Sequence, residues 1–429
     1  MFRVLIALVL IGPVPLTGCE RDRRDDERSG ADAAATQSAG SQATDSHRQG
    51  DQADLDQLRS LPYVGFSPVE EDEQQDGTVV HDGERSYPGY NLYTIRELCK
   101  AVVFDAEGRV INTWQDPEGR FWERTELLSN GDCLIVGSSN LGLPRPRISD
   151  ESRYLMRLDW AGKLIWKRSL LVHHDVQVTP QGKILVLGFK RRLIPQVHPK
   201  IQTREDHLIM LDQAGEVLKM HSLYDAFRAR PDIFRFQQVR PNTLGGVPWV
   251  DLFHSNSLEW MYREHLFERD SIYASDNVLV CLRHQHIVAI LNWPRNEIVW
   301  AWGQGEISGP HDAQVLESGN ILIFDNGMGR NCSRVIELEP LSGEIVWEYK
   351  APEPSDFYTR GRGSAQRLPN GNTLITESMA GRAFEVTRHG QIVWEFRCPE
   401  RNEKGERASL VRTIRYETSL IERILETHR

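Results

Sequence analysis

Four basic residues occupy matching positions in a repeating pattern and could carry chemistry. Counting eight residues back from a turn glycine reaches His174 in one repeat and His311 in another. His254 takes the comparable place in a longer repeat, and Arg283 ends the strand after it. A neutral imidazole can act as nucleophile or base, and a guanidinium can give an oxyanion two parallel hydrogen bonds. Together they favour an anionic ligand, although the sequence leaves open whether His173 or His174 faces it.

Further polar and aromatic residues fall in the loops assigned to the same side of the repeats. Asn326 ends a strand there, and Trp302, Phe357 and Tyr358 could hold an aromatic ring. The basic residues of these loops are Lys190, Arg191, Arg192, Arg330, Arg360 and Arg362. They predict a positive funnel that draws in an anion. Asn326, Arg362 and Tyr358 are therefore candidate substrate-binding residues.

The elements that position these residues follow a repeat marked by tryptophan. Trp300, Trp347 and Trp394 are 47 residues apart, by subtraction of their numbers, and each ends a pair of hairpins with Asn-Gly or Ser-Gly turns. The outer hairpin recurs six times along the chain. Four short strands per unit at this spacing are typical of a propeller blade. We therefore predict an all-β fold, a six-bladed β-propeller, rather than a β-sandwich.

The two ends of the repeat region complement each other. The last inner strand, near 409–414, has no outer hairpin after it, whereas the first outer hairpin, 102–114, has no inner strand before it. We expect the N- and C-terminal strands to share one blade, which would leave no free sheet edges. Because two antiparallel strands joined by a tight turn return to their start, the candidate histidines should converge at one mouth of the channel.

The N-terminal region has the pattern of an exported lipoprotein. Arg3 precedes an apolar run that is too short to span a bilayer, and Leu-Thr-Gly-Cys ends at Cys19. We expect residues 1–19 to be a signal peptide with a lipidated Cys, 20–60 a disordered tether, and 61–429 the propeller. The expected location is the bacterial cell envelope, with the propeller on the periplasmic or extracellular side and the lipid as membrane partner.

Composition narrows the remaining classes of ligand. The net charge of -10 argues against a nucleic-acid partner, since phosphate backbones need a basic face. Five cysteines follow Cys19 without paired spacing, so neither a disulfide framework nor a zinc site is indicated. A single bridge, such as Cys99 to Cys398, stays open.

Several segments together resemble the bacterial arylsulfate sulfotransferases, and the similarity spans about Gly89 to Tyr416. The segments that carry it are Gly89-Tyr-Asn-Leu, Val110-Ile-Asn-Thr-Trp, His254-Ser-Asn-Ser, Leu282-Arg-His-Gln, His311-Asp-Ala-Gln, Phe324-Asp-Asn-Gly and Thr413-Ile-Arg-Tyr. The resemblance implies a six-bladed propeller that moves a sulfuryl group from a phenolic sulfate ester to a phenol.

The resemblance also implies roles for particular residues. His311 would be the nucleophile, His254, Asn256 and Arg283 would hold the sulfuryl oxygens, and His174 would assist nearby. The partners would be a small aryl sulfate donor and a phenolic acceptor, with no cofactor and no metal. Transfer would pass through a sulfohistidine in a ping-pong cycle.

Three other functions remain open from the sequence. The chain could be a non-catalytic scaffold or ligand-binding protein of the envelope, which would need no converging histidines. It could be a quinone-cofactor dehydrogenase, although those sites need acidic ligands for calcium. The three histidines could instead hold a metal ion, which would call for carboxylates around them.

Overall fold

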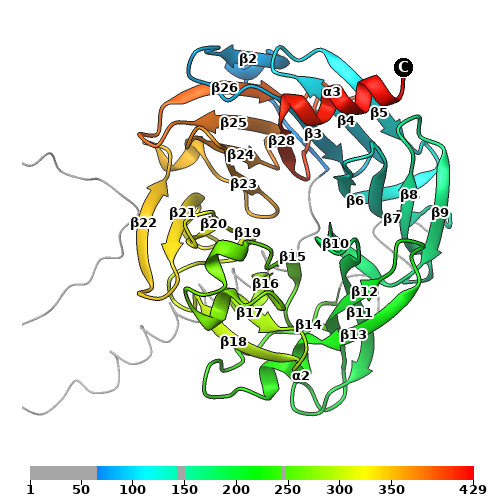
Figure 1. Ribbon diagram of the computed structural model, residues 1–429, viewed down its shortest axis with the longest axis vertical. Helices are drawn as coiled ribbons and strands as arrows, with labels where there is room; N and C mark the ends of the chain where they lie inside the picture. Colours follow the sequence, from blue (N-terminus) through cyan, green and yellow to red (C-terminus); the bar gives the residue numbers. More distant parts are fainter. Residues whose placement is uncertain (1–64, 143–149, 244–246) are drawn as a thin grey trace, which may run out of the picture.

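Six antiparallel sheets form a ring around a central channel (Figure 1), which confirms the predicted six-bladed propeller. The computed structural model describes residues 65–142, 150–243 and 247–429. The predicted signal peptide, Cys19 and the tether to residue 60 lie outside the described residues. No helix within the described ranges is long and apolar enough to cross a membrane.

Each blade has four antiparallel strands that run in order from the channel to the rim, and in the third blade β14 (Val250–Asp251) also pairs with β12, in parallel. The first three blades are β28 (Thr413–Tyr416), β3 (Tyr90–Ile95), β4 (Lys100–Asp105) and β5 (Val110–Gln115); β6 (Gly119–Leu127), β7 (Cys133–Ser139), β8 (Arg153–Leu158) and β9 (Leu164–Ser169); and β10 (Val172–Val178), β11 (Ile184–Leu193), β12 (Gln202–Leu211) and β13 (Val217–Ser222). The others are β15 (Ser255–Trp260), β16 (Asn277–Leu282), β17 (Ile287–Asn292) and β18 (Glu297–Trp302); β19 (His311–Val315), β20 (Ile321–Asp325), β21 (Arg334–Glu339) and β22 (Glu344–Tyr349); and β23 (Ser364–Arg367), β24 (Thr373–Glu377), β25 (Arg382–Val386) and β26 (Ile392–Arg397).

Strands from both ends of the described chain meet at one junction of the ring. β28 pairs with β3, so the last strand forms the channel side of the first blade. A strand absent from the sequence prediction, β2 (Gly77–His81), pairs with β26 and extends the last blade at its rim. Nearby, β1 (Phe66–Ser67) pairs with β27 (Arg407–Ala408). The junction is therefore held at the channel and at the rim.

The tryptophan spacing has a direct structural cause. In five blades an indole Nε1–H on the outermost strand donates to a backbone carbonyl in the outer turn of the next blade, and we call these contacts the Trp clasps. They are Trp114 to Asp159 O (2.9 Å), Trp166 to Gln213 O (3.1 Å), Trp300 to Pro340 O (3.0 Å), Trp347 to Arg388 O (2.9 Å) and Trp394 to Ala106 O (2.8 Å). The last one joins the final blade to the first. Because each clasp needs the same register, tryptophan recurs at the blade period.

Neighbouring blades are also joined beside the channel. A polar side chain on one innermost strand accepts a hydrogen bond from a backbone N–H of the next innermost strand. The pairs are Gln177 with Trp260 N (2.7 Å), Glu259 with Val315 N (2.6 Å) and Gln366 with Arg415 N (2.8 Å). Apolar side chains fill the space between the sheets, and the polar contacts lie at the rim edge, the channel edge or both edges of an interface.

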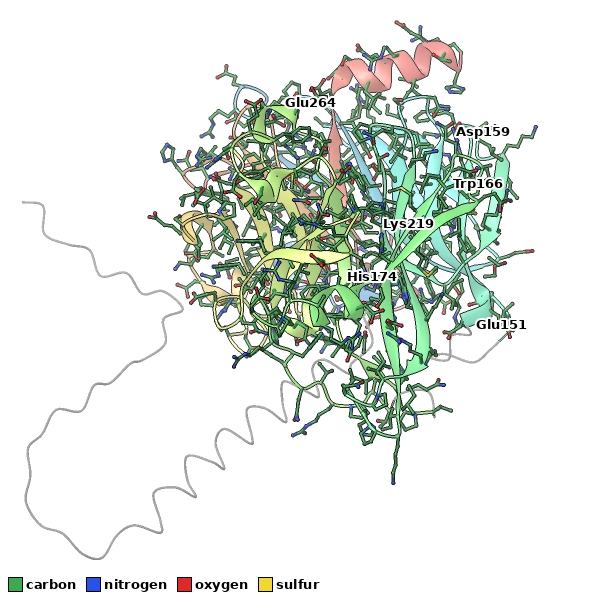
Figure 2. The ribbon with its side chains drawn as sticks, turned by 60° about the horizontal axis from the view of Figure 1, so that its bottom comes forward. Glu151, Asp159, Trp166, His174, Lys219 and Glu264 are labelled. Carbon is green, nitrogen blue, oxygen red and sulfur yellow. The ribbon has the colours of Figure 1, made fainter. Side chains whose placement is uncertain are left out.

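The helices are few and lie outside the sheets. They are the α-helices α2 (Leu223–Arg228) and α3 (Thr418–Thr427) and the short 3-10 helices η1 (Glu71–Glu73), η2 (Asp150–Ser152), η3 (Glu264–Leu266), η4 (Ser271–Tyr273), η5 (Arg283–Gln285) and η6 (Pro354–Asp356). α3 buries Ile421 and Ile424 against the cluster between the first two blades. Figure 2 shows Glu264 and Asp159 near the end of the propeller on which α3 lies, and Glu151 near the other end, with His174 between them.

The bridge from Cys99 to Cys398 that the sequence left open is not formed. Cys398 is a buried thiol whose Sγ lies 3.1 Å from Glu400 Oε2. Burial, followed by the charge of Glu400, raises the pKa of this thiol well above its usual value.

Candidate active site

Irregular starts to three innermost strands aim the predicted site residues into the channel. The pairing register shifts at β10, β15 and β19, between Val172 and Val176, between Ser255 and Ser257, and between His311 and Gln314. His174, His254, Asp312 and Arg362 have positive φ values of 57°, 49°, 48° and 59°. Side chains other than glycine seldom adopt this backbone, and bulges of this kind redirect side chains next to active sites.

A cavity at the channel mouth brings several of these residues together. With the part that opens to solvent it measures about 460 Å³. Its walls are formed by Arg96, Glu123, Arg124, His174, Asn256, His311, Asp312, Arg362, Gly363, Val411 and Arg412. Four arginines and two carboxylates line this wall, and Arg96, Arg124 and Arg412 are also paired with Glu97, Glu126 and Asp175 behind it. Of the predicted residues, His174, Asn256, His311 and Arg362 are on this wall, and His254 adjoins it, since its ring centroid lies 5.0 Å from that of His174.

His311 is buried with its proton position fixed by its neighbours. Nδ1 lies 2.7 Å from Asn326 Oδ1 and 3.1 Å from Gly309 O, and both of these atoms accept. Asn326 Nδ2 in turn donates to the carbonyls of Thr359 and Arg362, which fixes the amide orientation. Nδ1 therefore carries the proton, and Nε2 accepts from the backbone N–H of Arg362 at 3.2 Å. Burial and then the charge of Arg283 hold the pKa of His311 well below its usual value, so the ring is neutral near pH 7.

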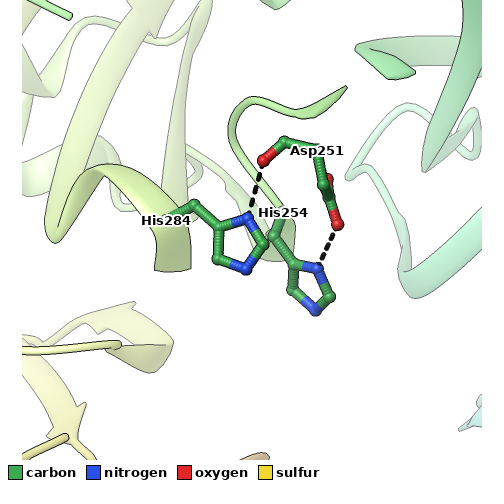
Figure 3. A group of neighbouring side chains, drawn as sticks. All are labelled: Asp251, His254 and His284. Carbon is green, nitrogen blue, oxygen red and sulfur yellow. Dashed lines mark hydrogen bonds and ion pairs between the residues drawn. The ribbon is translucent and has the colours of Figure 1, made fainter. Parts of the chain in front are cut away.

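His254 is held by a carboxylate that the sequence analysis did not identify. Its Nδ1 donates to Asp251 Oδ2 at 2.6 Å (Figure 3). Burial lowers the pKa of His254, although Asp251 opposes this, and the carboxylate keeps the proton on Nδ1. The lone pair of His254 is therefore on Nε2, the same nitrogen as in His311.

Arg283 is held by the histidine that follows it. Its Nη1 donates to His284 Nε2 at 3.0 Å, and His284 Nδ1 donates to the backbone carbonyl of Asp251 at 2.6 Å. Arg283 is 5% exposed, and its Nε finds no hydrogen-bond partner among the described residues. A buried N–H of this kind is available to an oxyanion.

The structure answers which of the paired histidines faces the cavity. His174 lines it, whereas His173 is fully buried behind it. His173 Nε2 lies 3.3 Å from Gly188 O, so its Nδ1 accepts the 2.8 Å bond from His174 Nδ1. This again leaves the lone pair on Nε2 of His174. Glu123 Oε2 accepts from the His174 backbone N–H at 2.9 Å and holds the bulged strand in place.

The remaining candidates take different positions. Asn256 Nδ2 donates to Pro310 O at 2.8 Å, while its buried Oδ1 has no hydrogen-bond partner in the described chain. Asn326 is fully buried and uses its amide to hold the His311 ring, so it lies behind the site rather than on its wall. Arg362 Nη1 donates to Ser409 Oγ at 3.1 Å. Tyr358 is half-buried, and its backbone N–H donates to Glu377.

The expected positive funnel of loop arginines differs in the structure. Arg191 pairs with Asp150 at 2.6 Å, Arg192 with Glu205 at 2.5 Å, and Arg330 with Asp325 at 2.6 Å. These partners neutralise three of the six residues expected in the funnel, whereas Arg362, another of the six, lies on the cavity wall. Phe357, expected as a stacking residue, is buried in the core against Phe324 and Phe384.

Several functional neighbours were missed because only folding brings them close. Glu123, Arg96 and Arg412 come from blades without a candidate histidine. Arg153 and His174 together with Arg96 hold the pKa of Glu123 well below its usual value, against the effect of burial. A signal did exist for Asp251, which precedes His254 by three residues, and for His284, which follows Arg283 directly.

Asp251, His254 and His284 form the one group of the described residues with metal-binding geometry, since a ligand atom from each lies within 4.8 Å of the others. Two of the possible ligand atoms are already used, because Asp251 Oδ2 accepts from His254 and His284 Nε2 accepts from Arg283, whereas Asp251 Oδ1 accepts no hydrogen bond from the described residues. A guanidinium beside the second histidine also repels a cation. The residues present therefore fit an oxyanion better than a metal ion.

Comparison with known proteins gave one family and several distant folds. A family model described as arylsulfotransferase (ASST) matches residues 154–399. No curated protein matches the sequence. Among solved structures, a Bacteroides caccae protein of unknown function is 15% identical, covering 76% of this chain and 98% of its own, with a TM-score of 0.48. A streptogramin B lyase is 12% identical, covering 82% of this chain and 97% of its own, with a TM-score of 0.41.

Proposed function

This chain belongs to the arylsulfotransferase family, and we propose that it transfers a sulfuryl group from a phenolic sulfate ester to a phenol through a histidine intermediate. The observation that carries the proposal is the neutral His311, whose lone pair is on Nε2, at the wall of a cavity lined by four arginines. Attack on a sulfuryl group needs such a nucleophile together with fixed donors for the sulfuryl oxygens.

In the first half of the proposed cycle, the hydrogen bond from the Arg362 backbone N–H to His311 Nε2 breaks, and the lone pair that it occupied attacks sulfur. The bond from sulfur to the ester oxygen breaks, and its electron pair leaves with the aryloxide. Arg283 and Arg362 stabilise the charge on the sulfuryl oxygens and the departing oxygen. The resulting sulfohistidine keeps its Nδ1 proton, which stays bonded to Asn326 Oδ1.

In the second half, the acceptor phenol takes the place of the departed aryloxide. His254 Nε2 removes the phenolic proton, the phenolate oxygen attacks sulfur, and the electron pair of the nitrogen–sulfur bond returns to His311. His254 then releases its proton to solvent, where it balances the aryloxide released first. Asp251 supports this role because a charged partner at 2.6 Å stabilises the protonated ring.

The test is transfer from a chromogenic aryl sulfate to a phenol, measured with the purified full chain. We expect wild-type transfer that is lost in His311→Ala, and a sulfohistidine that can be trapped when donor is supplied without acceptor. The matched control is His221→Ala, because His221 packs on Trp293 away from the cavity. Folded wild-type protein that is inactive across several donors and acceptors would refute the proposal and favour a scaffold or ligand-binding role.

We also propose that the propeller is exported and lipid-anchored at the cell envelope. The support is the sequence alone: an apolar run over 4–11 and a small-residue box that ends at Cys19. Labelled fatty acid should be incorporated into the wild-type chain and not into Cys19→Ser. Equal labelling of the two proteins would contradict the anchor.

A further inference from the structure

We propose that Asp251 is the shared positioning residue of the site, holding His254 through its carboxylate and Arg283 through its backbone carbonyl. The inference rests on the proposed function and adds two positioning residues to it, Asp251 and His284. Both lie behind the residues that would touch the substrate. Their effect is to fix a base and an oxyanion donor relative to each other.

Two chains of hydrogen bonds, here called arms, start at Asp251, and the first runs from its carboxylate to His254. Asp251 Oδ2 accepts from His254 Nδ1 at 2.6 Å, and Asp251 is 4% exposed. Although burial favours the neutral acid, His254 and Arg204 hold the pKa of Asp251 well below its usual value, so the group is ionised. An ionised acceptor fixes the His254 tautomer and favours the protonated ring that follows proton transfer.

The second arm runs from the backbone. Asp251 O accepts from His284 Nδ1 at 2.6 Å, which leaves His284 Nε2 to accept from Arg283 Nη1 at 3.0 Å. The rings of His254 and His284 also pack on each other, with centroids 4.7 Å apart and planes 35° apart (Figure 3). The guanidinium is therefore aimed by a neutral ring that is itself tied to Asp251.

The His254 arm uses the carboxylate of Asp251 and the Arg283 arm uses its backbone carbonyl, so different substitutions can test the two arms separately. Asp251→Asn keeps the backbone carbonyl and an acceptor oxygen but removes the charge, which changes only the His254 arm. His284→Phe keeps a packed ring but loses both hydrogen bonds, which changes only the Arg283 arm. A merely structural role would predict similar effects from both substitutions.

The charge around His254 decides the direction of the pH effect. The groups that face it are Asp251, Arg204, Arg283, His173, His174, His284 and His311. The charge of Asp251 raises the pKa of His254, while the charges of Arg283 and Arg204 lower it. Removing the Asp251 charge should therefore lower the pKa of His254 further, by about one pH unit or more.

The experiment measures kcat and KM between about pH 5 and pH 8 for the full chain, the two variants and the control His221→Phe. We expect the acid limb of kcat/KM to move to lower pH in Asp251→Asn. His284→Phe should lose about 100-fold in kcat with its acid limb unmoved. His221→Phe should match the wild type. An unmoved limb in Asp251→Asn, or a full-rate His284→Phe, would overturn the inference.

A second readout does not depend on sulfuryl transfer. Nitrogen-15 NMR of the imidazoles should show the Nδ1–H tautomer for His254 and His284 in the wild type, with His284 unchanged in Asp251→Asn. Loss of transfer with these tautomers intact would count against the proposed function alone. If the purified chain instead carries one zinc ion per molecule that Asp251→Ala releases, the three residues are metal ligands and the positioning role is wrong.

Discussion

The rim and the mouth of this propeller are built from the same six blades, but the contacts at the rim repeat from blade to blade whereas the residues at the mouth vary. At the rim the Trp clasps repeat one contact, and the fully buried Trp394 carries it across the ring junction. At the mouth only three of the six blades begin their innermost strand with a candidate histidine, namely His174, His254 and His311, and the other three carry different residues there. The Trp clasp can form between any two neighbouring blades, so the same residue recurs. The starts of the innermost strands all face one channel, so each blade can place a different residue there.

This difference separates the residues that hold the fold from those proposed to do chemistry. A contact made between every pair of neighbours contributes to stability wherever it occurs. A strained backbone beside a cavity costs stability and persists only where surrounding contacts hold it. Substitution at the rim should therefore change the free energy of unfolding, and substitution at the mouth should change transfer.

The largest effect on stability is expected where the ring closes. Arg415 on β28 and Glu385 on β25 form a fully buried ion pair at 2.6 Å. Arg415→Met leaves the buried carboxylate of Glu385 without its cation and should reduce the free energy of unfolding by about 3–5 kcal/mol, measured by denaturant titration. Adding Glu385→Gln to this variant should restore part of the loss. Equal stability of the single and double variants would show that the pair is not coupled.

At the mouth, Arg283→Gln should remove the main donor to the sulfuryl oxygens. We expect a loss of about 10²–10³ in kcat/KM, with the denaturation midpoint changed little. The measurement is the transfer assay beside a thermal melt of the same preparations. A variant that unfolds early and keeps its specific activity when folded would place Arg283 with the fold rather than the site.

A smaller effect is expected from single clasps. Trp394→Phe removes the indole donor to the carbonyl of Ala106, which keeps its bond from Thr78 Oγ1, and should cost about 0.5–1.5 kcal/mol. Trp166→Phe removes the same bond from an exposed setting, where water can replace the donor, and should cost less. Both variants should keep full activity per folded molecule. If Trp166→Phe costs more than Trp394→Phe, burial is not what makes the clasp stabilising.

The smallest effect is a matter of pH. His254 must be neutral to accept a proton, and burial lowers its pKa below the ordinary value. The kcat/KM for the acceptor phenol should therefore be constant above about pH 7 and should fall only as the pH drops through the lowered pKa of His254. Its profile should be followed with a donor whose leaving group stays ionised. An acid limb above about pH 7 would mean that another group controls proton transfer.

The sequence predicted the rim more completely than the mouth. Trp300, Trp347 and Trp394 recur because the clasp repeats, so spacing alone indicated the blades. The histidines were placed by the same register. Asp251 and His284 were not, because their role depends on hydrogen bonds that only the folded chain defines. The pairing of β2 with β26 escaped prediction for a similar reason, since it joins segments that are distant in sequence.

The charge of the mouth was the least predictable feature. Arg191 and Arg192 look like free cations in sequence, but their acidic partners come from other strands. Arg96 and Arg412, which do line the cavity, lie far from every histidine in sequence. Counting basic residues in a loop therefore says little about the field until each one's partner is known.

The pairing of β28 with β3 also determines when the propeller ring can close during folding. Residues 413–416 must find residues 90–95 across almost the full length of the described chain. Such distant pairing is slow, because the entropy of closing the loop is lost before any contact is gained. The ring can close only after nearly all of the chain has emerged from the ribosome. Until then the channel edge of the first blade is unpaired, and such an edge makes a partly folded chain prone to aggregation.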